Sequence, residues 1–225
     1  MQRQKKFLAI RPFYYLLLTT NLFTILKTLI MNATSIAAIV AAAIILLMLF
    51  YFRNKLSAFL KDSSTIPDPS QRTYSLAKTI LAFWTFIILF SICYIAIACG
   101  YLPPLTQNVL ILMGIAVGTT TAGTTIDTLQ EQDNNIVRAQ DIYTKQGFLT
   151  DILSDANGIS IHRFQAVMFN IVYGASFIAI VVSEYRLLDF PQGTLALLGI
   201  SSGTYALLKV AENTTTPPTS PPMGH

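Results

Sequence analysis

The chain has 225 residues, of which 53% are hydrophobic and only 12% are charged, and its mean hydropathy is +0.55. Soluble domains carry about a quarter charged residues, so this composition excludes an ordinary soluble domain and favours a surface that faces lipid. Lysine and arginine exceed aspartate and glutamate by 15 to 11, and the positions of these charges are more informative than their sum.

The apolar segments, taken in chain order, predict an all-α integral membrane protein. A spanning helix needs about 20 mainly apolar residues. Three segments meet this requirement clearly: 35–52, 77–99 and 165–183. Two more are richer in Gly, Ser and Thr: 107–125 and 193–210. A further apolar segment, 12–30, predicts either an additional span or an interfacial helix, and on another reading Met31 is the start and the residues before it are an upstream extension.

The second half of the chain repeats the first at an offset of 85 residues. Residues 74–123 align with 159–208 without a gap, and the best-matching blocks read LILMGIAVGT from Leu110 and LALLGISSGT from Leu195. Each repeat predicts two helices, so the less apolar helix of each pair is supported by its place in the repeat. We therefore expect a helical bundle of about five transmembrane helices, four of them from two tandem helix hairpins of the same orientation.

The positive charges predict the orientation. Arg53, Lys55, Lys61, Arg72 and Lys78 all lie near the linker between the first firm span and repeat 1, which places this linker in the cytoplasm. The connector between the repeats and the C-terminus are then cytoplasmic too. The predicted organisation is 1–30 an uncertain N-terminal span or interfacial helix, 31–54 a transmembrane helix, 55–73 a cytoplasmic linker, 74–125 repeat 1, 126–158 an acidic cytoplasmic connector with short helices, 159–210 repeat 2, and 211–225 a disordered Pro-rich tail.

Small residues recur at helical spacing in the second helix of each repeat. Glycines without side chains let two helix backbones approach closely in a membrane. They predict a helix-packing or oligomer interface, and packing of one repeat on the other and contact between subunits both remain open. The candidate residues are Gly114, Gly118, Gly123, Gly199 and Gly203.

Hydroxyl residues crowd the inner end of the same helices. Such hydroxyls can bond back to their own helix, or they can line a wet pore, where they replace part of an ion's hydration. Neither helix carries a charge at mid-span, so the usual mark of an ion or proton pathway is missing. The possible pore-lining residues are Thr119, Thr120, Thr121, Ser201, Ser202 and Thr204.

Lys78 and Arg163 occupy equivalent places at the start of the first helix of each repeat, three residues after Ser75 and Ser160. The serines predict N-caps. A cation there opposes the helix dipole, so we expect both cations to contact lipid headgroups at the inner leaflet.

The connector carries six acidic residues and an apolar stripe that predicts one or two short helices. With the Pro-rich tail, it is the predicted docking surface for a cytoplasmic protein partner. The segment 154–158 predicts a turn. Motifs for catalysis, metal or phosphate binding are missing from the sequence, so we expect no enzyme, no cofactor, no metal site and no nucleic-acid partner.

The pattern Ser-x-x-[Lys/Arg]…[Trp/Phe], which ends at Trp84 in repeat 1 and Phe169 in repeat 2, followed by LxLxGIxxGT, resembles uncharacterised bacterial polytopic inner-membrane proteins with duplicated helix hairpins. The resemblance covers about 74–209. It implies a shape and a bacterial inner-membrane location, but no activity and no catalytic residues.

These observations predict a non-enzymatic oligomeric membrane scaffold that anchors or regulates a cytoplasmic partner. The alternative is a small oligomeric channel or membrane-permeabilising effector, lined by the Gly/Thr-rich helices.

Overall fold

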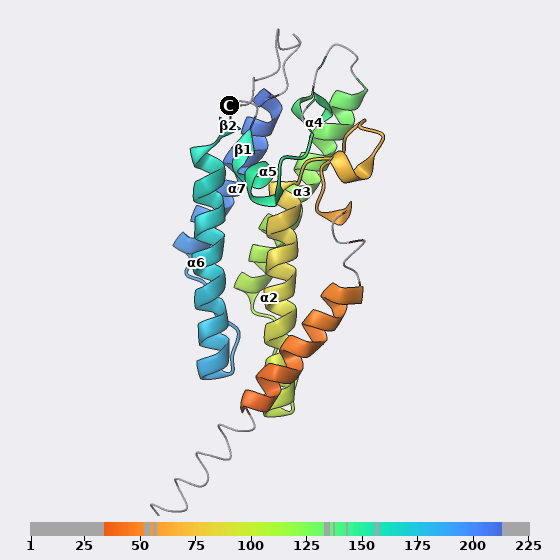
Figure 1. Ribbon diagram of the computed structural model, residues 1–225. Coiled ribbons are helices and arrows are strands. Elements are labelled where there is room, and N and C mark those ends of the chain that lie inside the picture. Colours follow the sequence, from red (N-terminus) through yellow and green to blue (C-terminus); the bar gives the residue numbers. More distant parts are fainter. Residues whose placement is uncertain are drawn as a thin grey trace, which may run out of the picture.

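The computed structural model (Figure 1) describes residues 34–51, 55, 58–132, 136, 138–142, 144–155 and 158–212. The predicted all-α class is confirmed, and the described strands form a single two-stranded hairpin. The elements are a helix over Thr34–Tyr51, η1 (Pro69–Gln71), α2 (Leu76–Cys99), α3 (Gln107–Glu131), α4 (Ala139–Ile142), α5 (Phe148–Leu153), β1 (Ser154–Asp155), β2 (Gly158–Ile159), α6 (Ile161–Glu184) and α7 (Gln192–Glu212). The predictions for residues 1–30 and for the tail beyond Glu212 lie outside the described residues.

Four of the described helices are long and apolar enough to cross a membrane: Thr34–Tyr51, Leu76–Cys99, Gln107–Glu131 and Ile161–Glu184. Their lengths and compositions fit an integral membrane protein. α7 is a fifth long helix of 21 residues, and its crossing of a membrane stays a prediction.

The helix ends preserve the sequence repeat. α2 and α6 have 24 residues each and start 85 positions apart. α3 and α7, with 25 and 21 residues, also start 85 positions apart. α2 and α6 both end in a left-handed residue, Gly100 at φ 74° and Tyr185 at φ 53°. Ser75 and Ser160 are the N-cap residues, as predicted, but neither side chain forms the capping hydrogen bond.

The four repeat helices form a staggered bundle. In Figure 1, α2 and α6 run side by side in one direction, and α3 and α7 return in the other. The return from α6 to α7 folds back along α2, because Tyr185 stacks on Tyr94 with ring centroids 6.0 Å apart and Phe190 meets Trp84 at 5.8 Å. Trp84 and Tyr94 lie about 15 Å apart along the helix axis. Residues 185–190 therefore run nearly extended along α2.

The segments that connect α2 to α3 and α6 to α7 displace α3 and α7 along the bundle axis by about half a helix length relative to α2 and α6. Asn108, at the start of α3, donates from Nδ2 to the Phe190 carbonyl at 2.8 Å. Twelve residues later, Thr120 donates to the Ala77 carbonyl at 3.3 Å. α3 therefore begins near the middle of α2 and continues well beyond the first residues of α2.

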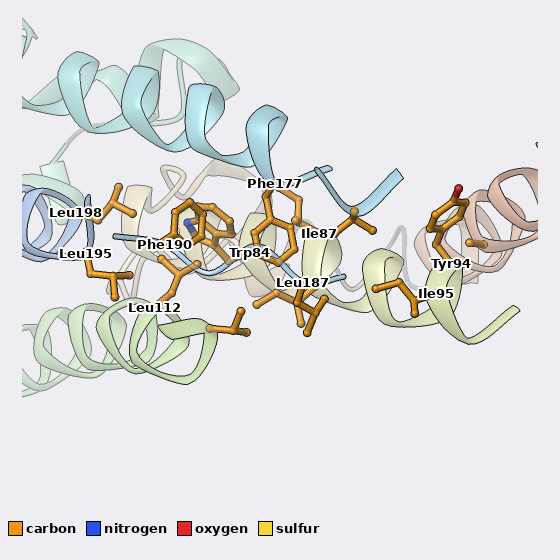
Figure 2. Packing of buried hydrophobic residues seen from close by; sticks show 14 of the residues in the cluster. Trp84, Ile87, Tyr94, Ile95, Leu112, Phe177, Leu187, Phe190, Leu195 and Leu198 are labelled. Atoms are coloured by element: carbon orange, nitrogen blue, oxygen red, sulfur yellow. The ribbon is translucent and has the colours of Figure 1, made fainter. Parts of the chain in front are cut away.

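Aromatic rings fill the centre of the bundle (Figure 2). Phe190 contacts Trp84, Tyr173 and Phe177 with ring centroids 5.7 to 6.0 Å apart. Leu112, Leu195 and Leu198 complete this core from α3 and α7. At the far end of α2, the core includes Ala37 and Ala41 of the Thr34–Tyr51 helix, which lies beside Tyr94 and Ile95.

The connector contains the predicted short helices, α4 and α5, and they are followed by the β1–β2 hairpin at the predicted turn. Its predicted first boundary was too early, because α3 continues to Glu131 rather than ending near residue 125. The extra turns are held by side-chain contacts of Asp127, which is buried within the cap described next.

Candidate functional site at the connector end

The linker and the connector together form a folded cap on one end of the bundle. Within the linker, Ser75 donates its backbone N–H to the Leu60 carbonyl at 2.7 Å, and Lys61 pairs with Tyr74 in an isolated bridge. The buried ammonium of Lys61 donates to the carbonyls of Pro69 and Ser70 at 2.8 and 2.6 Å. We call residues 58–75 and 138–160, together with the end of α3, the cap.

A buried arginine binds the connector to the end of α3. Arg138 is 2% exposed, and it donates to the Asp127 carbonyl at 3.0 Å and to the Asp141 carboxylate at 2.6 Å. Its Nη1 lies 3.4 Å from Glu131, and Gln140 donates to Asp127 at 2.7 Å. We call these five residues the Arg138 cluster. Arg138 Nη2 is buried and has no hydrogen-bond partner among the described residues.

The Arg138 cluster also holds the linker. The backbone N–H of Thr65 donates to Asp141 Oδ1 at 2.7 Å, and the Ser64 hydroxyl donates to the Gln140 carbonyl at 2.7 Å. Burial alone would raise the pKa of Asp141, but the Thr65 N–H and the Arg138 guanidinium outweigh burial and hold the pKa below its usual range. The carboxylate is therefore charged at neutral pH.

A second carboxylate joins the linker to α5. Asp151 accepts from the backbone N–H groups of Tyr74 at 3.2 Å, Gln146 at 3.0 Å and Gly147 at 3.2 Å. Asp127, Asp141 and Asp151 thus bond within the cap. The acidity of the connector is in large part structural, and the sequence did not predict this.

A cavity lies under the cap, between the inner halves of the four repeat helices. It is small and partly open, with a free volume of about 10 Å³, and it is lined by Leu76, Ala77, Ile80, Ala116, Thr119, Ala166, Ser201, Ser202 and Tyr205. Arg163 lies over the Tyr205 ring at 5.2 Å. Farther along α2 and α3, the buried side chains of Trp84 and Leu112 belong to the closed core (Figure 2).

The predicted pore-lining residues divide into two groups. Thr119, Ser201 and Ser202 line the cavity. Thr120 instead bonds to Ala77 and to its own helix, and Thr121 is exposed. Thr204 is partly buried but does not line this cavity.

The predicted glycines lie mostly on open helix surface within one chain. A Cβ added at Gly114, Gly118, Gly123 or Gly203 would meet no atom within 4 Å, and at Gly199 it would lie 3.7 Å from Ile115. Gly123 is nonetheless buried, and a side chain at Gly199 would touch Ile115 of the other repeat. Packing of one repeat on the other and contact between subunits both stay predictions.

Close helix approach occurs at a glycine that the motif did not include. A Cβ on Gly174 of α6 would lie 2.4 Å from the Phe83 ring and 2.8 Å from Ile87 of α2. Nearby, Trp84 Nε1 donates to Asn170 Oδ1 at 2.6 Å. Asn170, a buried amide in an apolar helix, was the available signal in the sequence for this contact.

The two predicted headgroup cations have protein contacts. The Lys78 ammonium donates to the Lys61 carbonyl at 2.6 Å, which joins the start of α2 to the linker. Arg163 packs on Tyr205. Their contact with lipid headgroups stays a prediction.

No family model matches the chain, and the searches of curated proteins and of solved structures found no match either. The described residues contain no group of three or more His, Cys, Asp or Glu side chains that could hold a metal ion.

Proposed function

We propose that the protein is a non-enzymatic, oligomeric membrane scaffold whose cap recruits or regulates a cytoplasmic protein. The observation that supports this best is the cap itself. Segments far apart in the sequence are fixed to one another by hydrogen bonds from backbone N–H groups to carboxylates, such as Thr65 with Asp141 and Tyr74 with Asp151. A surface that is already ordered loses less conformational entropy when it binds a partner.

The exposed face of the extended α3 is the proposed contact surface on the cap. Beyond Thr120 this helix exposes Thr121, Thr125, Thr128 and Leu129, and Leu129 is an apolar side chain at 62% exposure. Three of the connector's carboxylates form hydrogen bonds inside the cap. The partner therefore contacts this mixed polar and apolar face rather than a uniformly acidic surface. The tail beyond residue 212 is a further proposed contact.

The oligomeric part of the proposal rests on the open glycine face. Gly114, Gly118 and Gly203 are exposed on α3 and α7, and among the described residues no atom beyond the backbone of their own helices lies within 4 Å of a Cβ added there. Small residues on such faces are used for helix contact between chains in membranes.

Mild-detergent purification after crosslinking tests both parts. The wild-type chain is compared with Thr125→Arg/Leu129→Arg, and with Gln71→Arg as a control that adds a charge at an exposed position of the linker. We expect a discrete oligomer that carries a cytoplasmic protein in stoichiometric amount. The partner should be lost from the α3 variant while the oligomer is kept. Equal recovery of every co-purifying protein with the wild type and the α3 variant would disprove docking at this face.

A channel is the second candidate, because Thr119, Ser201 and Ser202 line a cavity. The buried Trp84 and Leu112 lie beyond it, so conduction would need a pore formed between subunits at the glycine face. That pore predicts conductance in reconstituted bilayers that changes with Gly118→Leu or Gly203→Leu. Bilayers that stay silent at all voltages tested would count against it.

A further inference from the structure

An apolar surface surrounds the start of α6, at the edge of the cap. Leu149 of α5 is 64% exposed, Ile159 of β2 is 78% exposed and Ile161 of α6 is 68% exposed, and Phe164 in the first turns of α6 is also exposed. We call these four residues the collar. Their elements adjoin one another, since β2 pairs with β1 directly after α5 and Ser160 donates to the Leu153 carbonyl at 2.9 Å.

The collar continues into the apolar face of a candidate membrane span. Below Phe164, α6 exposes Met168, Ile171 and Val172, in a helix long and apolar enough to cross a bilayer. The exposed polar side chains between this face and the collar are His162 and Gln165, in the first two turns of α6. The occupant that fits both surfaces is therefore the same bilayer. Arg163 lies in this first turn, where a cation suits anionic headgroups.

The exposed surface of α3 changes from apolar to polar at a matching level. After Gln107, its exposed side chains in the first half are Leu110, Ile111 and Val117. The second half exposes mainly polar side chains, Thr121, Thr125, Thr128 and Glu131, with Leu129 as an apolar exception. The bond from Thr120 to Ala77 places this change at the start of α2. Tyr205 of α7 packs with Ala77 and Ala166, which places the start of α6 at the same level.

We propose that the connector-side surface of the bilayer lies at this level, with the collar inserted into the headgroup boundary. The depth of α3 follows from this placement. Residues 107–120 cover only about 20 Å along the axis, whereas the hydrocarbon core is about 30 Å thick. α3 and α7 are therefore half-membrane helices that begin inside the hydrocarbon, and residues 100–106 and 185–191 lead into them from the far side.

Non-helical backbone is tolerated at membrane depth where protein covers its polar groups. The return segment of repeat 2 meets this condition, because Leu187 and Phe190 are buried and the Phe190 carbonyl is bonded to Asn108. The placement puts the second half of α3, with Thr121, Thr125 and Thr128, outside the hydrocarbon.

Spin-label depth measurement tests the proposal on the full chain. Single cysteines replace Ile159, Leu105, Thr128, Ile171 or Gln71 in a Cys93→Ala/Cys99→Ser background, in vesicles of three parts phosphatidylcholine to one part phosphatidylglycerol. All five positions are exposed, so folding is expected to survive, and the emission of Trp84 checks it. Collision with oxygen is compared with collision with a water-soluble nickel chelate at each position.

Ile171 serves as the lipid standard and Gln71 as the water standard. We expect Leu105 to match Ile171, Thr128 to match Gln71, and Ile159 to lie between the standards. A water-like value at Ile159, repeated with Ile161→Cys, would overturn the collar. A water-like value at Leu105 together with a lipid-like value at Thr125→Cys would show that α3 crosses the whole bilayer. This result would overturn the assignment of α3 as a half-membrane helix. Neither outcome bears on recruitment of a partner.

Discussion

Gly174 has more consequence at the residue scale than the glycines of the repeated motif. Its position next to Phe83 and Ile87 leaves no room for a methyl group. We expect Gly174→Ala to lower the free energy of unfolding by about 1–3 kcal/mol through overpacking between α2 and α6. Thermal unfolding in mild detergent measures this change.

Gly193→Ala is the matched control, because a Cβ there meets no atom of the described residues outside its own helix backbone, and Gly193 is not part of the proposed subunit interface. We expect no loss of stability, and a gain of up to about 1 kcal/mol from the better helix propensity of alanine. Equal effects of the two substitutions would contradict the assignment of Gly174 as the close-contact position.

The hydrogen bond between Trp84 and Asn170 is a second feature at this scale. Both side chains are buried, and the bond of 2.6 Å joins equivalent helices of the two repeats. Asn170→Leu leaves the indole N–H unpaired, and we expect a loss of about 1–3 kcal/mol. Trp84 is the single tryptophan of the chain, so its emission during unfolding reports this change directly. Ser176→Ala, on the exposed side of α6, should leave both emission and stability unchanged.

At the scale of elements, the Arg138 cluster decides whether the cap is one unit. Removing the guanidinium leaves the Asp127 carbonyl and the partly buried Asp141 carboxylate with fewer partners, which typically costs about 1–3 kcal/mol. We expect Arg138→Leu to raise amide hydrogen exchange at Thr65 and in α4, and to leave α2 and α6 protected. Arg186→Leu removes an exposed pair with Glu184 instead and should leave exchange in the cap unchanged. Normal protection of Thr65 in Arg138→Leu would show that the linker is held by other contacts.

The hydrogen bond from the Thr65 N–H to the Asp141 carboxylate depends on pH in a defined direction. The folded-state pKa of Asp141 is below its ordinary value of 3.8, so the stabilisation is present above 3.8 and is lost as pH falls through the lower, folded value. We expect protection of the Thr65 amide to be constant from neutral pH down to about 4 and to decrease below it. Asp141→Asn should remove this decrease. A loss of protection near neutral pH would point to another titrating group.

The sequence predicted the helices of the repeats well because each is a long apolar segment. The starts of α2 and α7 were predicted within one residue of those observed. The stagger could not be predicted, since a return such as 185–191 is short and carries no periodicity. The cap was missed for a related reason. Bonds such as Thr65 to Asp141 join residues 76 positions apart, and neither residue is unusual in its own segment.

Small-residue patterns show a similar limit. The spacing of Gly114 and Gly118 predicts a surface that another helix can approach, but it does not identify that helix. In this fold their face is open, and Gly174, which stands in no such motif, meets α2. What a glycine contacts depends on the rotation and level of its helix, and the stagger sets both.

At the scale of the whole molecule, the two hairpins make corresponding contacts. α2 packs on α6 and α3 packs on α7, so helices related by the repeat are in contact, and within each repeat α2 packs on α3 and α6 packs on α7. The asymmetry is confined to the surroundings, such as the Thr34–Tyr51 helix beside α2 and the deeper burial of Leu187 compared with its equivalent, Leu102.

This pairing of equivalent helices has an evolutionary consequence. Two separate copies of one such hairpin, inserted in the same direction, would place their first helices together and their second helices together around a twofold axis. A duplication that fused these copies would need only a connector on the side where the first copy ends and the second begins. The present chain has the form of such a fused dimer, and its cap occupies the site of the fusion.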